Sequence, residues 1–451
     1  MFVLKDNMSV GANNGRAVLV DQEGDEPVKY LSHKYSLILF SLLYFDSMEE
    51  CIAFLCKRSA ADQHIEEDIE AFVQTNEHCL QKLDATKSEA QKMKAVSLLQ
   101  KLSHPDQRNA GNEYRLDFPV KLVWIPTFKC NRSCRYCGVA RLDAEENECK
   151  IPFSKVMERL EEAVRGGVTS VVIHGGEPLF CYDENIFTAL KFLRDHHVDI
   201  KISTKNHISP GMAKRLADTG LHEIQLSLDT VDEDLLEALY GEKNYLPRFQ
   251  NSVANLKSVG IDIRLNIVVS TINYQYISEL LVYLSSLGVE KVILSHYRSG
   301  GETEEDFSLS LNQRTWLFKE IRKNKRNFSF KKFRFFPYEP VPPAQERPLC
   351  ESCRVAMLVL PNGTCCYCDF LSEDSRFILG DLHEQTIEDV WYSKEVERFF
   401  NPLADFSRGS RCADCSGFDY CVKRGYCFLK MNRDQILSPD YVCAECGGNR
   451  L

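Results

Sequence analysis

Apolar and polar positions in the middle of the chain switch repeatedly between the period of a strand and the period of a helix. From residue 118 onward, short apolar runs of strand length are followed by stretches in which apolar residues recur every three or four positions. The expected strands are 120–125, 170–174, 200–204, 224–228, 261–269 and 291–295, and the expected helices are 153–164, 186–196, 212–217, a stretch ending at 259, and 277–287. Repeated βα units predict a parallel sheet with right-handed crossovers. Six units are fewer than the eight of a closed barrel, so the α/β fold expected is a partial (β/α)6 TIM-like barrel over residues 118–300.

The first 85 residues have a different pattern. Residues 16–21 predict a strand, and a second apolar stretch begins at Tyr30. Apolar residues at helical spacing then predict three helices within 37–43, 48–55 and 65–83. Two short strands followed by three helices are compatible with a small α+β winged-helix domain. The polar residues 86–117 are expected to be a linker with one helix.

Composition narrows the class of protein. The chain is 44% hydrophobic and 27% charged, which is ordinary for a soluble globular protein. Its 451 residues are too many for one domain. No apolar run reaches the roughly 18 residues of a membrane span, and the N-terminus lacks the order of a signal peptide. A net charge of −10 disfavours nucleic acid as the main partner. We therefore expect a cytoplasmic protein that binds neither nucleic acid nor membrane.

The cysteines change this picture. Nineteen are present, and without a secretory signal a disulfide framework is not expected. Three form one tight group and eleven lie after residue 349, and such clusters in a reduced compartment indicate metal. The tight group is Cys130, Cys134 and Cys137, with the spacing C-x3-C-x2-C. Three thiolates suit three irons of a 4Fe–4S cluster and leave the fourth iron open, whereas a zinc knuckle, the alternative, prefers four ligands.

This spacing on the loop after the first strand, with Tyr136 before the third cysteine, resembles the signature of radical S-adenosylmethionine enzymes. The resemblance implies that a cluster cleaves S-adenosylmethionine and that the resulting 5′-deoxyadenosyl radical abstracts a hydrogen atom. The segment Gly175-Gly176-Glu177-Pro178, after the second strand, is similar to the family's motif for the amino group of the cofactor. Taken alone, this segment is also a common strand-to-helix turn.

Further cofactor contacts are implied by the same resemblance. Ser203 and Asn206 follow the third strand and match the family's ribose contact, although the family often has Asn-Gly where this chain has Asn206-His207. Ser227 follows the fourth strand and is similar to a residue near the ribose or carboxylate, with a helix N-cap beside it as the alternative interpretation. Arg264, on the fifth strand, is a candidate for the cofactor carboxylate.

Residues 301–349 form a bridging region, and residues 350–451 resemble the SPASM extension of this family, which holds two auxiliary 4Fe–4S clusters. The matching pattern is C-x9-G-x4-C followed by C-x2-C-x5-C, and five residues stand before Cys427 where the family has three. The resemblance assigns one cluster to Cys350, Cys353, Cys368 and Cys427 and the other to Cys412, Cys415, Cys421 and Cys443. It leaves Cys365, Cys366 and Cys446 as spare or alternate thiols, and a pair of zinc ribbons is the alternative.

Asp369 directly follows Cys368. In the sulfatase-maturing relatives an aspartate at the matching place serves as a base, so Asp369 is the candidate catalytic residue. A turn residue near the cluster is the alternative interpretation.

Enzymes with this extension mostly modify peptides. We expect a maturase that installs a cross-link, in the first place a thioether of the sactipeptide or ranthipeptide type, on a ribosomally made precursor whose leader binds the N-terminal domain by β-augmentation. A flavodoxin or ferredoxin-type protein would donate electrons. Carbon–carbon cross-linking, epimerisation, sulfatase-type oxidation of Cys or Ser, and a non-catalytic cluster scaffold are the alternatives.

Overall fold

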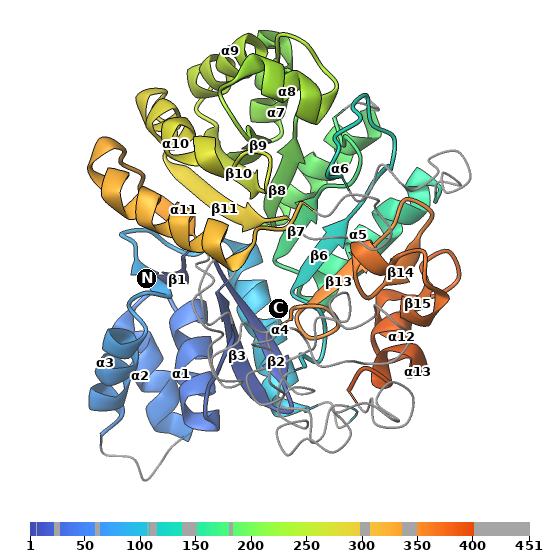
Figure 1. Cartoon of the computed structure of the whole chain (residues 1–451). Coiled ribbons are helices and arrows are strands. Elements are labelled where there is room, and N and C mark those ends of the chain that lie inside the picture. Colours follow the sequence, from blue (N-terminus) through green and yellow to red (C-terminus); the bar gives the residue numbers. More distant parts are fainter. Residues whose placement is uncertain are drawn as a thin grey trace.

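The computed structural model describes residues 1–5, 7–21, 28–58, 64–105, 108, 115–137, 151–179, 184–297, 307–335 and 350–400. Within these residues ten strands form one sheet, in the order β12-β11-β10-β9-β8-β7-β6-β13-β14-β15 (Figure 1). Their bounds are β6 Lys121–Trp124, β7 Ser170–Ile173, β8 Asp199–Thr204, β9 Glu223–Ser227, β10 Asp262–Val269, β11 Lys291–His296, β12 Lys332–Phe335, β13 Ala356–Val359, β14 Thr364–Cys366 and β15 Ile378–Asp381.

The strands β6 to β11 are parallel and adjacent in chain order, so the expected partial barrel of βα units is confirmed. Two further parallel strands extend it. β12 pairs with β11, and β13 pairs with β6 on the opposite side. The hairpin of β14 and β15 continues antiparallel from β13 and joins the cysteine-rich region to the sheet.

Helices surround the strands of this sheet (Figure 1). They are α5 Phe153–Gly166, α6 Glu184–Asp195, α7 Pro210–Asp218, α8 Glu233–Tyr240, α9 Tyr245–Ser258, α10 Ile277–Ser286 and α11 Leu311–Asn324, followed by the short α12 Ile387–Trp391 and α13 Lys394–Glu397. Burial alternates along β8, β9 and β10, because one side of each strand packs in the core and the other lines the inner face. That inner face is polar: Gln225 Nε2 donates to Ser203 Oγ (2.8 Å) and Ser295 Oγ donates to Asn266 Oδ1 (2.5 Å).

The N-terminal region is an α+β unit with more elements than the sequence pattern predicted. Its strands are β1 Phe2–Leu4, β2 Met8–Asn13, β3 Arg16–Asp21, β4 Val28–Tyr30 and β5 Leu80–Lys82, and its helices are α1 His33–Tyr44, α2 Met48–Arg58, α3 Ile65–Thr75 and α4 Glu89–Ser103. β2, β3 and β4 form an antiparallel meander, and Asn14 and Gly15, both at positive φ, make the first turn. Helix α4 packs on α1 within the expected linker region, and its Leu98 belongs to the N-terminal core.

The N-terminal unit is joined to the barrel by a small apolar cluster. Val18 and Val20 of β3 pack with residues just before β6 and at the start of β13, namely Leu116, Val120, Val355 and Ala356. The backbone N–H of Leu116 donates to the Arg354 carbonyl (2.9 Å), so the cysteine-rich region takes part in the same junction.

No helix in the described ranges is both long and apolar enough to cross a bilayer.

Candidate functional site

The three clustered thiols lie on the loop that leaves the carboxyl end of β6. Cys130 is exposed, and Cys134 and Cys137 are half-buried. Burial raises the pKa of Cys134 to about 11, while the positive charge of Lys205 acts to lower it. The charges of Cys130 and Cys137 also act on this pKa, so the structure brings the three thiols together at one end of the sheet.

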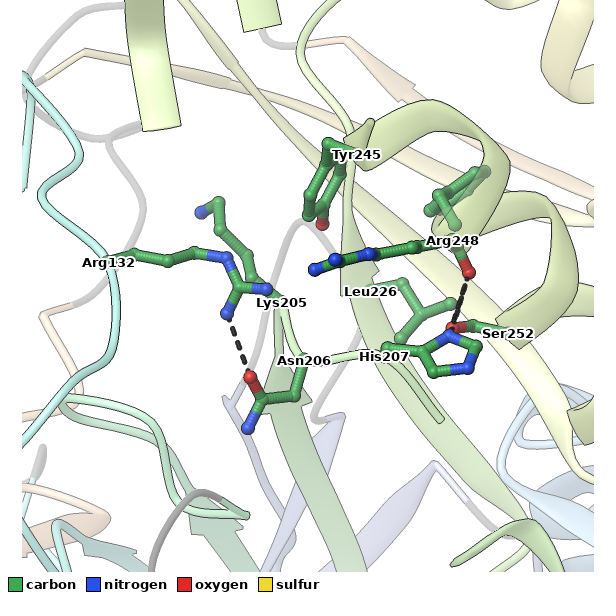
Figure 2. Close-up of a pocket in the computed structure, with 9 residues that line it drawn as sticks. Arg132, Lys205, Asn206, His207, Leu226, Tyr245, Arg248 and Ser252 are labelled. Carbon is green, nitrogen blue, oxygen red and sulfur yellow. Dashed lines mark hydrogen bonds between the residues drawn. The ribbon is translucent and has the colours of Figure 1, made fainter. Parts of the chain in front are cut away.

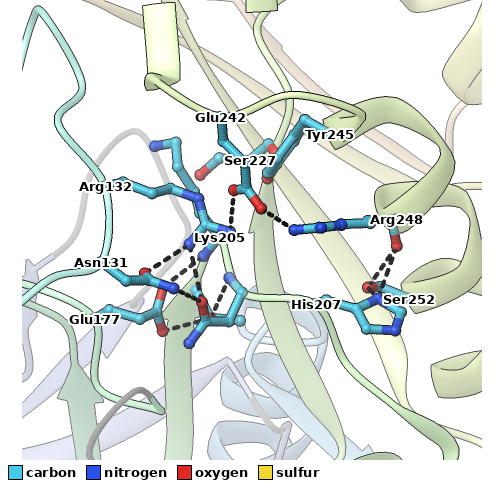
Figure 3. Close-up of polar contacts among 12 residues, drawn as sticks. Asn131, Arg132, Glu177, Lys205, His207, Ser227, Glu242, Tyr245, Arg248 and Ser252 are labelled. Carbon is cyan, nitrogen blue, oxygen red and sulfur yellow. Dashed lines mark hydrogen bonds and ion pairs between the residues drawn. The ribbon is translucent and has the colours of Figure 1, made fainter. Parts of the chain in front are cut away.

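Arg132, between the first two cysteines, anchors this loop to neighbouring segments. Its guanidinium is only 3% exposed and pairs with Glu242, with 2.6 Å between Nη2 and Oε2. It also donates from Nη1 to Asn206 Oδ1 (2.9 Å), the contact drawn as a dashed line in Figure 2, and Figure 3 shows the guanidinium beside Glu242. Asn131 Nδ2 donates to the same Asn206 oxygen (3.1 Å). A buried guanidinium without these acceptors would be costly, so the ion pair fixes the loop against the end of β8 and the segment between α8 and α9.

The loop backbone is also in contact with the end of α8. The N–H of Arg135 donates to the Leu239 carbonyl (3.1 Å). Gly241 ends α8 at φ 68°, and a Cβ there would lie 2.4 Å from Ser133 Oγ. A side chain at Gly241 would therefore be strained by the positive φ and would force the Ser133 hydroxyl to turn away.

Tyr136 is tied to a fully buried carboxylate. The hydroxyl groups of Tyr136 and Tyr240 both donate to Asp229 Oδ2, the second at 2.7 Å. The backbone N–H of Val268 donates to Asp229 Oδ1 (2.8 Å), and Asn273 Nδ2 donates to the Asp229 carbonyl (2.9 Å). Burial and the charge of Asp229 raise the pKa of Tyr136 well above its ordinary value, so the phenol keeps its proton and acts as a donor.

The Gly-Gly-Glu-Pro segment follows β7 and is hydrogen-bonded to the cluster loop. The N–H of Gly176 donates to the Thr127 carbonyl (3.0 Å) and that of Glu177 to the Lys129 carbonyl (2.8 Å). Gly175 has φ 134°, and a Cβ at Gly176 would lie 2.3 Å from the Lys129 oxygen. Both glycines are therefore required for the close approach of the two loops.

Glu177 and Pro178 are buried, and the Glu177 carboxylate accepts hydrogen bonds from the end of β8. Its Oε1 accepts from Thr204 Oγ1 (2.5 Å), and its Oε2 accepts from the N–H of Lys205 (2.9 Å). Burial raises the pKa of Glu177, whereas these donors act to lower it. The carboxylate is thus positioned at the strand ends beside the thiols.

The four remaining cofactor candidates, Ser203, Asn206, Ser227 and Arg264, do not all lie near the thiols. Ser203 accepts from Gln225 on the inner face, and the Ser227 carbonyl accepts from the Tyr245 hydroxyl (2.8 Å). Asn206 is occupied by Arg132 and Asn131, so it supports the loop. Arg264 Nη2 pairs with Glu223 Oε1 (2.6 Å), at the first residue of β9. Because Glu223 is at the amino end of its strand, the structure does not bring Arg264 to the thiols.

A small pocket opens behind the loop (Figure 2). Arg132, Lys205, Asn206, Tyr245 and Arg248 are among the residues that line it. Arg248 pairs with the same Glu242 that holds Arg132. The ammonium of Lys205 lies 5.4 Å from the centre of the Tyr136 ring and 5.3 Å from that of Tyr240.

The second group of thiols surrounds the β13–β14 hairpin. Cys353 and Cys366 are buried, and Cys350 and Cys368 are half-buried. Burial raises the pKa of Cys353 to about 12, while Arg115 and Arg354 act to lower it. The charge of Cys350 acts on the pKa values of both Cys353 and Cys368, so these three thiols are neighbours.

The spacing within this group has a structural cause. Gly363 turns the chain between β13 and β14 at φ 86°, and a Cβ there would lie within about 3.3 Å of three side chains. Cys365 and Cys366 point to opposite faces of β14, with Cys365 Sγ 3.7 Å from Met357 Sδ and Cys366 Sγ 3.5 Å from the Cys368 carbonyl. The expected ligands Cys412, Cys415, Cys421, Cys427 and Cys443, and the spare Cys446, lie outside the described residues.

Asp369 lies near His174, the residue directly before the Gly-Gly-Glu-Pro segment. Burial lowers the pKa of His174, and the charge of Asp369 acts to raise it. Cys368 Sγ donates to Asp369 Oδ1 (3.4 Å). The candidate base therefore contacts a thiol of the second group and is within electrostatic range of His174, at the carboxyl end of β7.

The donor chemistry fits the cofactors that the resemblance implies. Each thiolate of a 4Fe–4S cluster takes a separate iron, so three soft ligands on one loop suit it. Among the described residues no three His, Cys, Asp or Glu side chains are grouped to hold a single metal ion. Beside the thiols, the close backbone approach at Gly176 and the buried carboxylate of Glu177 suit the polar end of S-adenosylmethionine.

Comparisons with known proteins agree with this site. The sequence model of the radical SAM superfamily matches residues 124–284, and that of the SPASM iron–sulfur cluster-binding domain matches residues 350–416. These two domains imply 4Fe–4S clusters and S-adenosylmethionine as cofactors. A curated relative, the mycofactocin maturase MftC of Mycolicibacterium smegmatis, is 27% identical over 348 residues, which are 74% of this chain and 85% of MftC.

Two solved structures share the fold. SuiB of Streptococcus suis, bound to its precursor peptide SuiA, has a TM-score of 0.70 and 18% identity, with 98% of this chain and all of that chain covered (100%). The anSMEcpe structure with bound AdoMet has a TM-score of 0.55 and 17% identity, covering 73% of this chain and 92% of that one. These matches do not establish a winged helix at the N-terminus.

Sequence reasoning missed the residues that support the loop. Arg132, Lys205 and the neighbours Tyr240 and Glu242 come from three separate segments, and nothing in their local pattern links these segments. Of these residues Arg132 was the easiest to suspect from the sequence, because it is a charged residue inside a cysteine motif. In the structure its side chain is 3% exposed, and such a buried charge needs an acidic partner.

Proposed function

We propose that this chain, a radical SAM enzyme with a SPASM domain, modifies a ribosomally made precursor peptide. The observation that carries the proposal is the extent of the likeness. The relative MftC is named a maturase and matches over 74% of this chain, and SuiB, solved with its precursor peptide, shares the fold over 98% of it, N-terminal region included.

The residues of the first site have defined tasks in this proposal. Cys130, Cys134 and Cys137 hold the cluster, and Glu177 receives the amino group of the cofactor. When bound, the reduced cluster and S-adenosylmethionine supply a carbon-centred radical that takes a hydrogen atom from the substrate. The protein orients the reactants and excludes water, which is the task of the loop held by Arg132 and Asp229.

We place the proton acceptor at Asp369. Its carboxylate is beside Cys368 and within the electrostatic range of His174, at the junction of the barrel and the second thiol group. Cross-linking through a cysteine removes a thiol proton, which a carboxylate there can accept, and one further electron, which a cluster bound by the SPASM domain would take up. A thioether is therefore the bond that we propose first.

Coexpression with the short precursor encoded nearest to this chain tests the function. Mass spectrometry of the peptide should show the loss of two hydrogens if a cross-link forms, whichever bond it is. A peptide that remains unmodified, in mass and in deuterium content after reaction in heavy water, would contradict the maturase proposal. The variant with Cys130, Cys134 and Cys137 all replaced by alanine is the control.

The type of bond is a separate measurement. Alkylation of the product with iodoacetamide should leave the cross-linked cysteine unlabelled if the bond is a thioether. A product with the same mass loss and with every cysteine labelled would exclude the thioether and point to a carbon–carbon bond. An electron donor of the flavodoxin or ferredoxin type would supply the electrons in the cell.

A further inference from the structure

The backbone of Lys205 is fixed at the end of β8. Its N–H donates to Glu177 Oε2 (2.9 Å), and the side chain of the preceding Thr204 donates to the other oxygen of the same carboxylate (2.5 Å). The next residue, Asn206, is held by Arg132. With both neighbours and its own amide engaged, Lys205 has little freedom except in its side chain.

The side chain of Lys205 extends over two aromatic rings that are themselves fixed. The ammonium is 5.4 Å from the centre of the Tyr136 ring and 5.3 Å from that of Tyr240, which is the range of a cation–π contact. Both phenols donate to the buried Asp229, so the rings cannot turn away without breaking those hydrogen bonds. Figure 2 shows Lys205 next to Arg132 at the pocket behind the loop.

The surroundings of this ammonium are negative. The charges of Cys134, Asp229, Cys137 and Glu177 all favour the cation and raise the pKa of Lys205, although burial acts against the charge. Lys205 thus carries a positive charge over the ring of Tyr136, the residue between Cys134 and Cys137 in the loop.

Arg132 is a second cation in this region, and its charge is already balanced. It forms an ion pair with Glu242 at 2.6 Å. Lys205 has no carboxylate at ion-pairing distance within the part of the chain that the structure describes. Unlike Arg132, Lys205 therefore has a charge that no ion pair balances and that can act on the thiolates.

We propose that Lys205 is a positioning residue whose fixed positive charge raises the reduction potential of the cluster held by Cys130, Cys134 and Cys137. Reduction adds one electron, donated by a low-potential protein, to a cluster that already carries three thiolates. A nearby cation in a partly desolvated site stabilises the added negative charge, and the potentials of such clusters depend on net charge and solvent exposure. The inference rests on the cluster site alone and does not depend on the peptide substrate.

The test compares Lys205→Met and Lys205→Gln with Lys205→Arg in the reconstituted full-length enzyme. The readout is the midpoint potential of this cluster from a redox titration followed by electron paramagnetic resonance, without S-adenosylmethionine or peptide. The signal of this cluster is the one that disappears when Cys130, Cys134 and Cys137 are replaced by alanine. Lys243→Met is the matched control, because that lysine is 76% exposed and lies 3.5 Å from Glu237.

Both neutral variants should titrate at a more negative potential than the wild type, and Lys205→Arg and Lys243→Met should stay close to it. If the neutral variants fail to hold the cluster while Lys205→Arg holds it, cluster retention instead of the potential shows that a positive charge is needed at this position. An unchanged potential in the neutral variants, a shift in Lys205→Arg as large as theirs, or failure of all three to hold the cluster would overturn the proposal. Failure of the peptide assay would leave this measurement unaffected.

Discussion

The two groups of thiols use the same residue type in different supports. The first group lies on an irregular loop with one exposed cysteine. Asn206 after β8, the Leu239 carbonyl of α8 and Glu242 before α9 hold that loop in place. The second group surrounds a β-hairpin. Backbone pairing holds Cys365 and Cys366, and the Cys353 N–H donates to the Ala356 carbonyl at the start of β13, where Cys353 is 3% exposed. The difference teaches that a few polar contacts keep the first group of thiols open to a cofactor, whereas the second group is positioned by the hairpin of the sheet.

Replacing each group of cysteines should give the largest difference in effect between the two sites. The Cys130, Cys134 and Cys137 triple alanine variant should lose all formation of 5′-deoxyadenosine, because the open cluster is gone. The Cys350→Ala, Cys353→Ala variant should keep cleavage of S-adenosylmethionine and lose modified peptide. Iron content and nucleoside chromatography measure the first outcome, and mass spectrometry of the peptide measures the second. Turnover that survives in the triple variant would remove the distinction between the sites.

Within the support of the first site, Asp229 should matter more than an exposed carboxylate of the same region. In Asp229→Ala the hydroxyls of Tyr136 and Tyr240 lose their buried acceptor, so we expect a loss of about 3 kcal/mol in the free energy of unfolding. Urea unfolding of the cofactor-free protein measures it. Asp232→Ala, which removes only the N-cap of α8, should cost about 1 kcal/mol. Equal losses in the two variants would contradict the role given to Asp229.

Two glycines allow a smaller and more selective perturbation. A Cβ at Gly176 meets backbone at 2.3 Å in the first site, and Gly363→Ala forces φ 86° on a residue with a side chain in the second. Each variant should lower the iron bound by its own site and spare the other, as resolved by their separate electron paramagnetic resonance signals.

Gly211→Ala is the control for both glycine variants. Its Cβ would meet nothing within 4 Å, and it lies in helix α7, where alanine should gain roughly 0.5–1 kcal/mol. Loss of both clusters in either test variant would mean that the two supports are not independent.

The smallest expected effect is a pH dependence that only the first site should show. The pKa of Glu177 is raised above its ordinary value of 4.5 in the folded protein, so the native state binds its proton more tightly than the unfolded chain. Its contribution to stability is complete below that value and is lost as the pH rises through the folded pKa.

Urea unfolding of cofactor-free wild type and Glu177→Gln between pH 4 and 7 measures this effect. The difference in the free energy of unfolding, wild type minus variant, should fall as the pH rises, by about 1.4 kcal/mol for each unit of pKa shift. A difference that is constant or rises with pH would mean that hydrogen bonds from Thr204 and Lys205 outweigh the burial of the carboxylate.

Much of the fold was predictable because helix and strand periods are local properties. The six parallel strands were identified from apolar runs, and the structure places them side by side in chain order. The missed elements are short or unusual: β2 ends in the hairpin signal Asn14-Gly15, and β12 and β13 have four residues each. Helix α4 was expected, but its packing on α1 was not, because a polar segment does not reveal which neighbour buries its few apolar residues.

By itself the sequence determined the chemistry of the site, since thiol spacing and the Gly-Gly-Glu-Pro segment are contiguous and their meaning is local. Only the tertiary structure decided which side chains surround that chemistry. Asn206 turned out to hold Arg132, and Arg264 faced Glu223 at the amino end of the strands. Lys205, an unremarkable lysine in the sequence, became the cation beside the thiols. The physical reason is that charges act through space over a few ångströms, and only folding sets those distances between distant segments.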